Sequence, residues 1–122
     1  MAKLQRVLIT GAGGFIGSHL VERVLASGTA ARAFLRYTAE RSLGNLRHLD
    51  PGALKGVETV WGNLEDPYAV ARAVRGCDAV LHLGALVGIP YSYDAPQQYV
   101  MTNVLGTLNV LEACRAGGVE RL

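Results

Sequence analysis

The chain has 122 residues, half of them hydrophobic, and carries 12 lysines and arginines against 10 aspartates and glutamates. These values are typical of one globular domain with its own core. Because the basic residues are few and scattered, nucleic acid is not an expected partner. The longest apolar run, Ala79 to Pro90, is too short to cross a bilayer, and no signal-peptide core precedes the first apolar run. We therefore expect a cytoplasmic protein without a membrane partner.

Predicted strands and helices alternate along the chain. The predicted strands are Leu4–Ile9, Ala30–Leu35, Val57–Trp61 and Ala79–Leu83. Long helices are predicted at Gly14–Ser27 and Pro96–Ala116, and a short one at Leu43–Leu49 that is broken at Asp50-Pro51-Gly52. A further helix is predicted to run to Arg75, with Asp66 as its N-cap residue and Pro67 at position N1. The segment Gly84–Asp94 is expected to be a loop, and Val119–Leu122 to begin a further element.

This alternation predicts an α/β fold. Crossovers of this length join parallel strands and place helices on both faces of the sheet. We expect a Rossmann-like parallel sheet with strand order 3-2-1-4. Its ligand should lie above the carboxyl ends of the first and fourth strands, where the order reverses.

A glycine-rich turn directly follows the first predicted strand. The stretch Thr10-Gly-Ala-Gly-Gly-Phe-Ile-Gly17 comes after Val7-Leu8-Ile9 and leads into the first helix. Gly11 permits the sharp turn, Gly14 lets backbone approach a pyrophosphate, and Gly17 lets the helix pack closely on the sheet. The free N–H groups and positive dipole end of that helix favour phosphates. The turn therefore predicts a dinucleotide site.

Four segments together resemble the extended short-chain dehydrogenase/reductases, in their nucleotide-sugar epimerase/dehydratase branch. They are Thr10–Leu20, Gly62-Asn-Leu-Glu-Asp66, Leu81-His-Leu-Gly-Ala85 and Asn103–Ala113. The segment Gly88-Ile-Pro-Tyr-Ser-Tyr93 is most similar to sugar-nucleotide 4,6-dehydratases. The resemblance implies a nucleotide-sugar substrate, hydride transfer between the sugar C4 and NAD(P), and a homodimer in the full-length enzyme.

The resemblance also implies which residues bind the cofactor. Those implied at the pyrophosphate are Gly11, Gly14, Phe15, Ile16 and Gly17. The resemblance places Asn63 and Leu64 at the adenine. It places Leu83, Gly84 and Ala85 beside the ribose and nicotinamide, and Asn103 near the nicotinamide-side ribose. Asn63 stands where the family has aspartate, and Gly84 where it usually has alanine. An asparagine still accepts and donates a hydrogen bond, so adenine contact is expected to persist.

The end of the second predicted strand bears on the choice of dinucleotide. NAD-preferring members place an acidic residue there to bind the ribose hydroxyls. This chain instead has Leu35-Arg36-Tyr37-Thr38. The planar, permanently charged guanidinium of Arg36 suits a 2′-phosphate. We therefore predict NADP, with NAD as the alternative if Arg36 is only a solvated residue at a strand end.

The family's catalytic Tyr-x-x-x-Lys pair is absent from these residues. The lysines are Lys3 and Lys55, and neither lies four residues after a tyrosine. We assign no catalytic and no metal-binding residue. We interpret residues 1–122 as the N-terminal, NAD(P)-binding portion of a larger enzyme, and expect this portion to stop before the fifth strand of the sheet. The alternatives are a non-catalytic NADP-binding sensor or scaffold and an NADP-dependent ketone reductase.

Three further sites allow an ordinary structural interpretation. His82 lies in an apolar strand and is expected to be a core histidine with satisfied hydrogen bonds. Tyr91 and Tyr93 either contact the substrate or wedge their loop onto the long helix. Cys77 and Cys114 have neither metal-ligand nor redox spacing and are expected to be reduced thiols.

Overall fold

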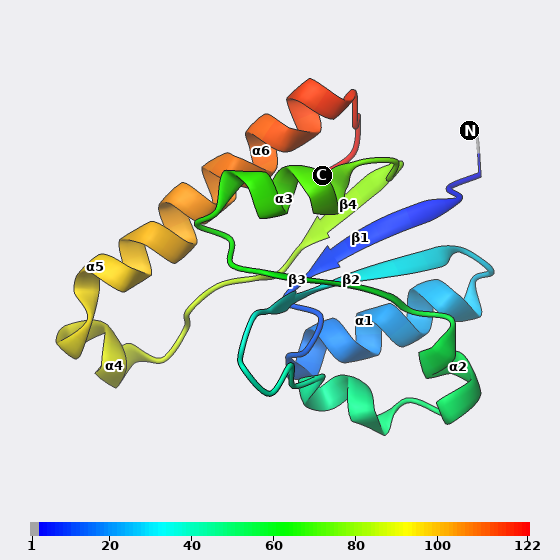
Figure 1. Ribbon diagram of the computed structural model, residues 1–122, viewed down its shortest axis with the longest axis horizontal. Helices are drawn as coiled ribbons and strands as arrows, with labels where there is room; N and C mark the ends of the chain where they lie inside the picture. The colour runs from blue at the N-terminus through cyan, green and yellow to red at the C-terminus, as the bar shows by residue number, and fades with distance from the viewer. Residues whose placement is uncertain (1–2) are drawn as a thin grey trace.

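The computed structural model describes residues 3–122 and contains a parallel, four-stranded sheet (Figure 1). The strands are β1 (Arg6–Thr10), β2 (Ala30–Arg36), β3 (Glu58–Gly62) and β4 (Ala79–His82). Their order is β3-β2-β1-β4, and every pairing is parallel. The predicted Rossmann-like sheet and its order are confirmed, with strand ends that shift by one or two residues.

Alternating side chains divide the interior into two cores, one on each face of the sheet. Val7 and Ile9 face a core shared with α1 (Phe15–Ala26), whereas Leu8 faces a core shared with α3 (Pro67–Val74) and α6 (Gly106–Gly117). Figure 1 shows α1 and α2 on one side of the sheet and α3 with α6 on the other. This is the double coverage that a buried parallel sheet requires.

The connector between β2 and β3 contains two short helices. The first, η1 (Gly44–His48), lies where a short helix is predicted. The second, α2 (Pro51–Lys55), begins where the sequence predicts only a break. Asp50 caps α2, because its Oδ2 accepts hydrogen bonds from the backbone N–H groups of Gly52 (3.1 Å) and Ala53 (3.4 Å). The Asp-Pro pair thus ends one helix and starts another.

The prediction of a loop over Gly84–Asp94 is wrong at its end. The helix α4 (Ile89–Asp94) forms there, with Gly88 as its N-cap residue. Pro90 lies in the first turn, where a missing N–H is not needed, so it is compatible with the helix. The Tyr99 hydroxyl donates to the Gly88 carbonyl and ties α4 to the helix that follows.

The long predicted helix forms as three consecutive pieces. They are α5 (Pro96–Tyr99), η2 (Val100–Leu105), which is π-helical, and α6. A π-helical turn inside an α-helix often marks a functional site, and this one faces the carboxyl end of the sheet. Among residues 3–122, no helix has the length and apolar character needed to span a membrane.

After α6 the chain returns to the edge of the sheet. Arg121 forms a parallel bridge with Ala79, and its carbonyl accepts a 3.0 Å hydrogen bond from the N–H of Val80. The predicted further element therefore begins beside β4, on the side away from β1. Asp66 caps α3 as predicted, because its Oδ1 accepts from the N–H of Tyr68 at 3.0 Å.

Arg32 is a buried cation that joins β2 to α3. Its Nη1 donates to the carbonyls of Ala73 (2.7 Å) and Arg75 (2.6 Å) at the end of α3. Its Nε lies 3.0 Å from Glu58 Oε2, although the N–H is not aligned for a hydrogen bond. Cys77, nearby, and Cys114 are free and buried, and burial raises the pKa of both thiols.

Candidate functional site

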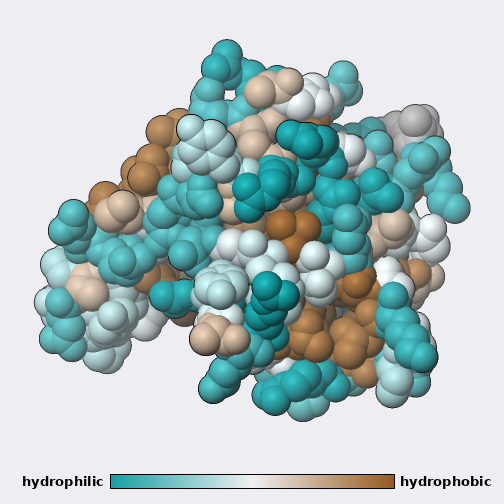
Figure 2. All heavy atoms as spheres, in the orientation of Figure 1, coloured by the Kyte–Doolittle hydropathy of each residue, from teal (hydrophilic) through white to brown (hydrophobic). Residues whose placement is uncertain are grey.

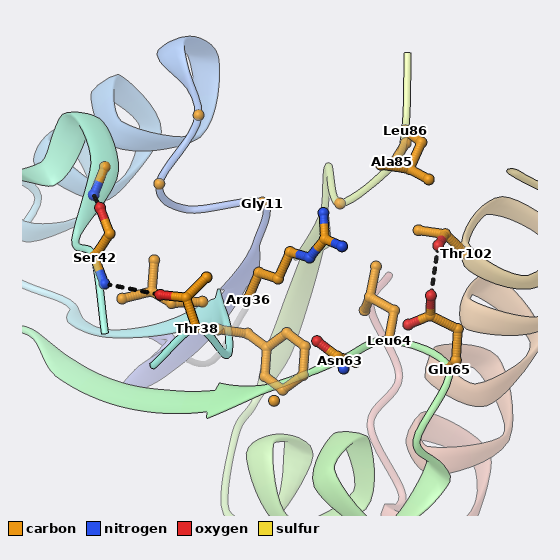
Figure 3. A pocket seen from close by; sticks show the side chains of 17 residues that line it. Gly11, Arg36, Thr38, Ser42, Asn63, Leu64, Glu65, Ala85, Leu86 and Thr102 are labelled. Carbon is orange, nitrogen blue, oxygen red and sulfur yellow. Dashed lines mark hydrogen bonds between the residues drawn. The ribbon is translucent and has the colours of Figure 1, made fainter. Parts of the chain in front are cut away.

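A cavity of about 320 Å³ lies at the carboxyl ends of the strands (Figure 3). Residues that follow each of the four strands contribute to its wall: Gly11 after β1, Arg36 at the end of β2, Leu64 after β3 and Ala85 after β4. Because all four strands are parallel, their carboxyl ends meet at one edge and bring these segments together. This is the edge at which an open α/β sheet binds ligands.

The glycine turn forms the floor of the cavity and ends in α1. Gly11 has a φ of +66°, and its carbonyl accepts a 3.0 Å hydrogen bond from the Gly14 N–H. No side chain caps α1, and no acidic residue lies in its first turn. The first N–H groups of the helix and its positive dipole end are therefore available to an anion.

The predicted cofactor-binding residues fall into two groups, those that line the cavity and those that do not. Those that line the cavity are Gly11, Gly14, Arg36, Asn63, Leu64, Gly84 and Ala85. The remaining predicted residues, Phe15, Ile16, Gly17, Leu83 and Asn103, do not line it. Phe15 and Ile16 are exposed at the start of α1, whereas Gly17 is buried under the turn.

Asn103 binds the backbone of the segment that follows β4. Its Oδ1 accepts from the Leu86 N–H at 2.8 Å, and its Nδ2 donates to the Leu86 carbonyl at 2.9 Å. The π-helical turn thereby holds the backbone next to Ala85 in place. Tyr91 and Tyr93 are exposed on α4, and the Tyr91 ring lies 6.1 Å from that of Tyr99.

Sequence reasoning missed the wall that the β2–β3 connector builds. Thr38, Ser42 and Gly44 line the cavity beside Arg36. The connector folds over the glycine turn, where the Asn45 N–H donates to the Gly13 carbonyl at 2.9 Å. Thr38 and Ser42 belong to no motif, so their hydroxyl groups become candidates only when the connector is seen against the turn.

Sequence reasoning also missed Glu65 and Thr102. Both line the cavity, and the Thr102 hydroxyl donates to Glu65 Oε1 at 2.6 Å (Figure 3). This contact joins the β3–α3 loop to the π-helical turn, across 37 positions of sequence. No local pattern marks it.

His82 joins β1, β4 and the long helix below the cavity. Its Nδ1 lies 2.6 Å from Thr10 Oγ1, and its Nε2 lies 3.1 Å from Thr107 Oγ1. The Thr107 hydroxyl donates to the Asn103 carbonyl (2.7 Å), so it accepts from His82 Nε2–H. Thr10 Oγ1 accepts 3.0 Å bonds from two N–H groups in the Leu83–Gly84 segment and donates its own proton to Nδ1. His82 is therefore neutral, and both of its ring nitrogens are hydrogen-bonded as the sequence predicts, although the side chain is half-buried and lies outside the core.

We expect this network to make folding pH-dependent. Burial lowers the pKa of His82 from its ordinary value of 6.5. In the window below 6.5 the unfolded chain therefore binds more protons than the folded chain, and the free energy of unfolding falls as pH falls through that window. His82→Gln cannot titrate, so its stability should fall less between about pH 7.5 and 5.5. At the higher pH the variant should be less stable by about 1–2 kcal/mol, because two threonine hydroxyls lose a well-placed partner.

Urea unfolding at the two pH values measures both effects. His48→Gln, at an exposed position on η1, is the matched control for the loss of a histidine. Equal pH dependence in wild type and His82→Gln would contradict the role of the network.

Comparison with known proteins places this geometry in a family. The family model for GDP-mannose 4,6 dehydratase matches residues 8–122. The chain belongs to this family. It is thus a member of the short-chain dehydrogenase/reductases, in the branch of sugar epimerases and dehydratases, as the resemblance of its motifs implies.

The relatives of this chain include both reductases and epimerases. A 2-alkyl-3-oxoalkanoate reductase of Stenotrophomonas maltophilia is 41% identical over 96% of this chain and 32% of its own. A probable UDP-glucuronate 4-epimerase of Rhizobium meliloti is 35% identical over 91% of this chain and 34% of its own. The UDP-glucose 4-epimerase of Thermus thermophilus, solved with NAD, has a TM-score of 0.75 at 38% identity over 95% of this chain and 35% of its own. The chain thus spans about a third of the length of these relatives.

Proposed function

We propose that residues 1–122 form the dinucleotide-binding part of a longer NADP-dependent enzyme, a sugar-nucleotide 4,6-dehydratase or epimerase. The observation that carries this proposal is the uncapped start of α1, which adjoins the glycine turn on the floor of the cavity. A dinucleotide pyrophosphate is the anion that fits such a helix start. Two structures of MoeE5, a neighbour at 34% identity, are complexes with a UDP-sugar and NAD, which supports a nucleotide-sugar substrate.

The residues around the cavity fit NADP. The N–H groups of Phe15 and Ile16, in the first turn of α1, would hold the pyrophosphate, and Leu64 would lie against the adenine. Arg36 would bind the 2′-phosphate, with hydroxyl donors from Thr38 and Ser42 on the same wall. When bound, the nicotinamide supplies the hydride donor or acceptor of the reaction. The segment Leu83–Ala85, fixed by Thr10, would limit where that ring lies.

Calorimetric titration of the chain with NADP and with NAD tests this proposal. We expect both dinucleotides to bind and NADP to bind more tightly, because the second phosphate adds charge-assisted hydrogen bonds. Failure of both to bind would contradict the proposal for this chain.

An NADP-dependent ketone reductase is the second candidate, and Arg36 is equally compatible with it. An epimerase or dehydratase returns the hydride to its substrate, whereas a reductase consumes reduced cofactor with every turnover. The relative from Stenotrophomonas maltophilia is named as a reductase of oxoalkanoates, which are ketones. Both candidates are compatible with a preference for NADP, so turnover by the full-length enzyme separates them: a reductase consumes one reduced cofactor per product, whereas an epimerase or dehydratase leaves the amount of reduced cofactor unchanged.

We also propose that the full-length protein is a homodimer. Apolar side chains are exposed along one face of the long helix, at Met101, Val104, Leu108 and Leu111. Figure 2 shows apolar residues gathered along the flank that α6 forms. Their spacing of three and four residues suits packing against a second helix. The same helix of a second copy of this chain would cover this apolar face. Sedimentation of the full-length protein measures the oligomeric state.

A further inference from the structure

Two charged side chains line the cavity, Arg36 and Glu65. Arg36 is exposed at the end of β2, whereas Glu65 is half-buried in the loop between β3 and α3. No ion pair within residues 3–122 joins them. In Figure 3 they stand apart, with Leu64 between them. The cavity therefore has a positive group on the side of β2 and a negative group on the side of the long helix.

The Glu65 carboxylate is held by one of its two oxygens. Oε1 accepts hydrogen bonds from Gln98 Nε2 and from Thr102 Oγ1, both at 2.6 Å. Gln98 Nε2 also lies 3.3 Å from Thr102 Oγ1, so the two donors support each other. Two short bonds on the same oxygen fix the orientation of the carboxylate. Within residues 3–122, Oε2 has no hydrogen-bond partner, and Figure 3 shows it on the side of the carboxylate toward Leu64 and the cavity.

An ionised carboxylate oxygen only accepts hydrogen bonds, so Oε2 suits a ligand group that donates one. Leu64 and Leu86 also line the cavity and would flank such a group. Asn63, which lies next to Leu64, has an amide that can rotate to present either a donor or an acceptor. Asn63 alone therefore cannot distinguish an amino group from a carbonyl at the same place on a ligand.

We propose that Glu65 is a specificity-determining residue of the dinucleotide site, whose Oε2 accepts a hydrogen bond from the exocyclic amino group of adenine. The inference rests on the proposed dinucleotide function and deepens it. It predicts selection of a 6-aminopurine over a 6-oxopurine, because the 6-oxo group of hypoxanthine would bring lone pairs against the carboxylate.

The variant Glu65→Gln isolates this role. Its amide oxygen can still accept from Gln98 and Thr102, so the link to the long helix is kept. Its amide nitrogen would take the place of Oε2 and turn an acceptor into a donor. The variant should therefore lose the preference for adenine without losing the shape of the site.

Calorimetric titration of wild type and Glu65→Gln with NADP and with its hypoxanthine analogue tests the proposal. We expect wild type to bind the adenine form at least about tenfold more tightly, since a hydrogen bond to a charged group contributes this much or more. The ratio should shrink to near unity or invert in Glu65→Gln. Glu120→Gln, an exposed position beside the amino end of β4, is the matched control and should keep the wild-type ratio.

Each outcome has a distinct meaning. An unchanged ratio in Glu65→Gln overturns the proposal and leaves dinucleotide binding in place. If wild type binds neither dinucleotide, the proposed function fails and this inference fails with it. If Glu65→Gln does not fold, Thr102→Val carries the test. Removing one donor from Oε1 frees the carboxylate and should reduce the ratio, and an unchanged ratio again overturns the proposal.

Discussion

Replacing Gly17 with alanine is expected to weaken dinucleotide binding by at least about tenfold and to destabilise the fold by about 1–3 kcal/mol. A Cβ at Gly17 would lie 2.8 Å from the Gly11 carbonyl carbon and closer still to its oxygen. Both are backbone atoms of the tight turn and cannot move aside as a flexible side chain can. The first turn of α1 must therefore shift away from the glycine turn, which would displace the N–H groups that are to hold the pyrophosphate.

Calorimetry with NADP and urea unfolding measure the two effects of Gly17→Ala. The matched control is Gly117→Ala at the end of α6, where a Cβ would meet Val74 at an ordinary 3.8 Å. That variant should bind as wild type does and unfold no more easily, because alanine is the better helix former. Wild-type affinity in Gly17→Ala would show that the close approach of helix and turn does not matter for the ligand.

Replacing Arg36 with alanine is expected to raise the Kd for NADP at least about tenfold and to leave that for NAD within about twofold. Arg36 lines the cavity at the last position of β2, and Glu65, on the opposite wall, is the only carboxylate among the lining residues. A 2′-phosphate beside the guanidinium would accept charge-assisted hydrogen bonds, whereas NAD has only a hydroxyl there. The preference for NADP should also shrink as salt is added, because Arg36 is exposed and its charge is screened.

Titrations with both dinucleotides measure the preference. Arg23→Ala removes an exposed arginine from the last turn of α1, at the far end of that helix from the cavity, and should leave both affinities unchanged. Arg36→Asp should go further than alanine and favour NAD, since a carboxylate at this position can bind the ribose hydroxyls. Equal weakening of both dinucleotides by Arg36→Ala would mean that the guanidinium contacts a part that they share, and the prediction of NADP would be withdrawn.

The local sequence pattern was sufficient to predict the sheet, because the spacing of apolar residues and the positions of glycine and proline indicate where strands and helices begin and end. Short apolar runs such as Val7-Leu8-Ile9, separated by crossovers of helix length, indicate buried parallel strands, and the connection rules favour the strand order that is observed. The same reasoning went wrong at α4. Gly84–Asp94 was predicted as a loop, although proline in a first turn is compatible with a helix, and in the structure the Tyr99 hydroxyl ties the start of that helix to the next one.

The glycine turn, Arg36 and the residues that end each strand were accessible from the sequence, because each follows directly from a strand whose place was known. The rest of the cavity lining was not accessible. Thr38 and Ser42 reach the cavity beside Arg36 because the connector folds back over Gly13. Glu65 reaches it with an orientation set by Gln98 and Thr102, which lie more than 30 positions later in the chain.

The doubly wound α/β fold and the glycine turn after its first strand follow from the sequence alone. Those properties depend on neighbours a few residues apart, whose spacing can be read from the chain. The polar groups that face one another across the cavity become clear only from the packing of the elements, and so does the hydrogen-bonded unit of Thr10, His82 and Thr107. Such contacts join positions far apart in sequence, and their distances follow from how strands and helices pack, which no local pattern specifies.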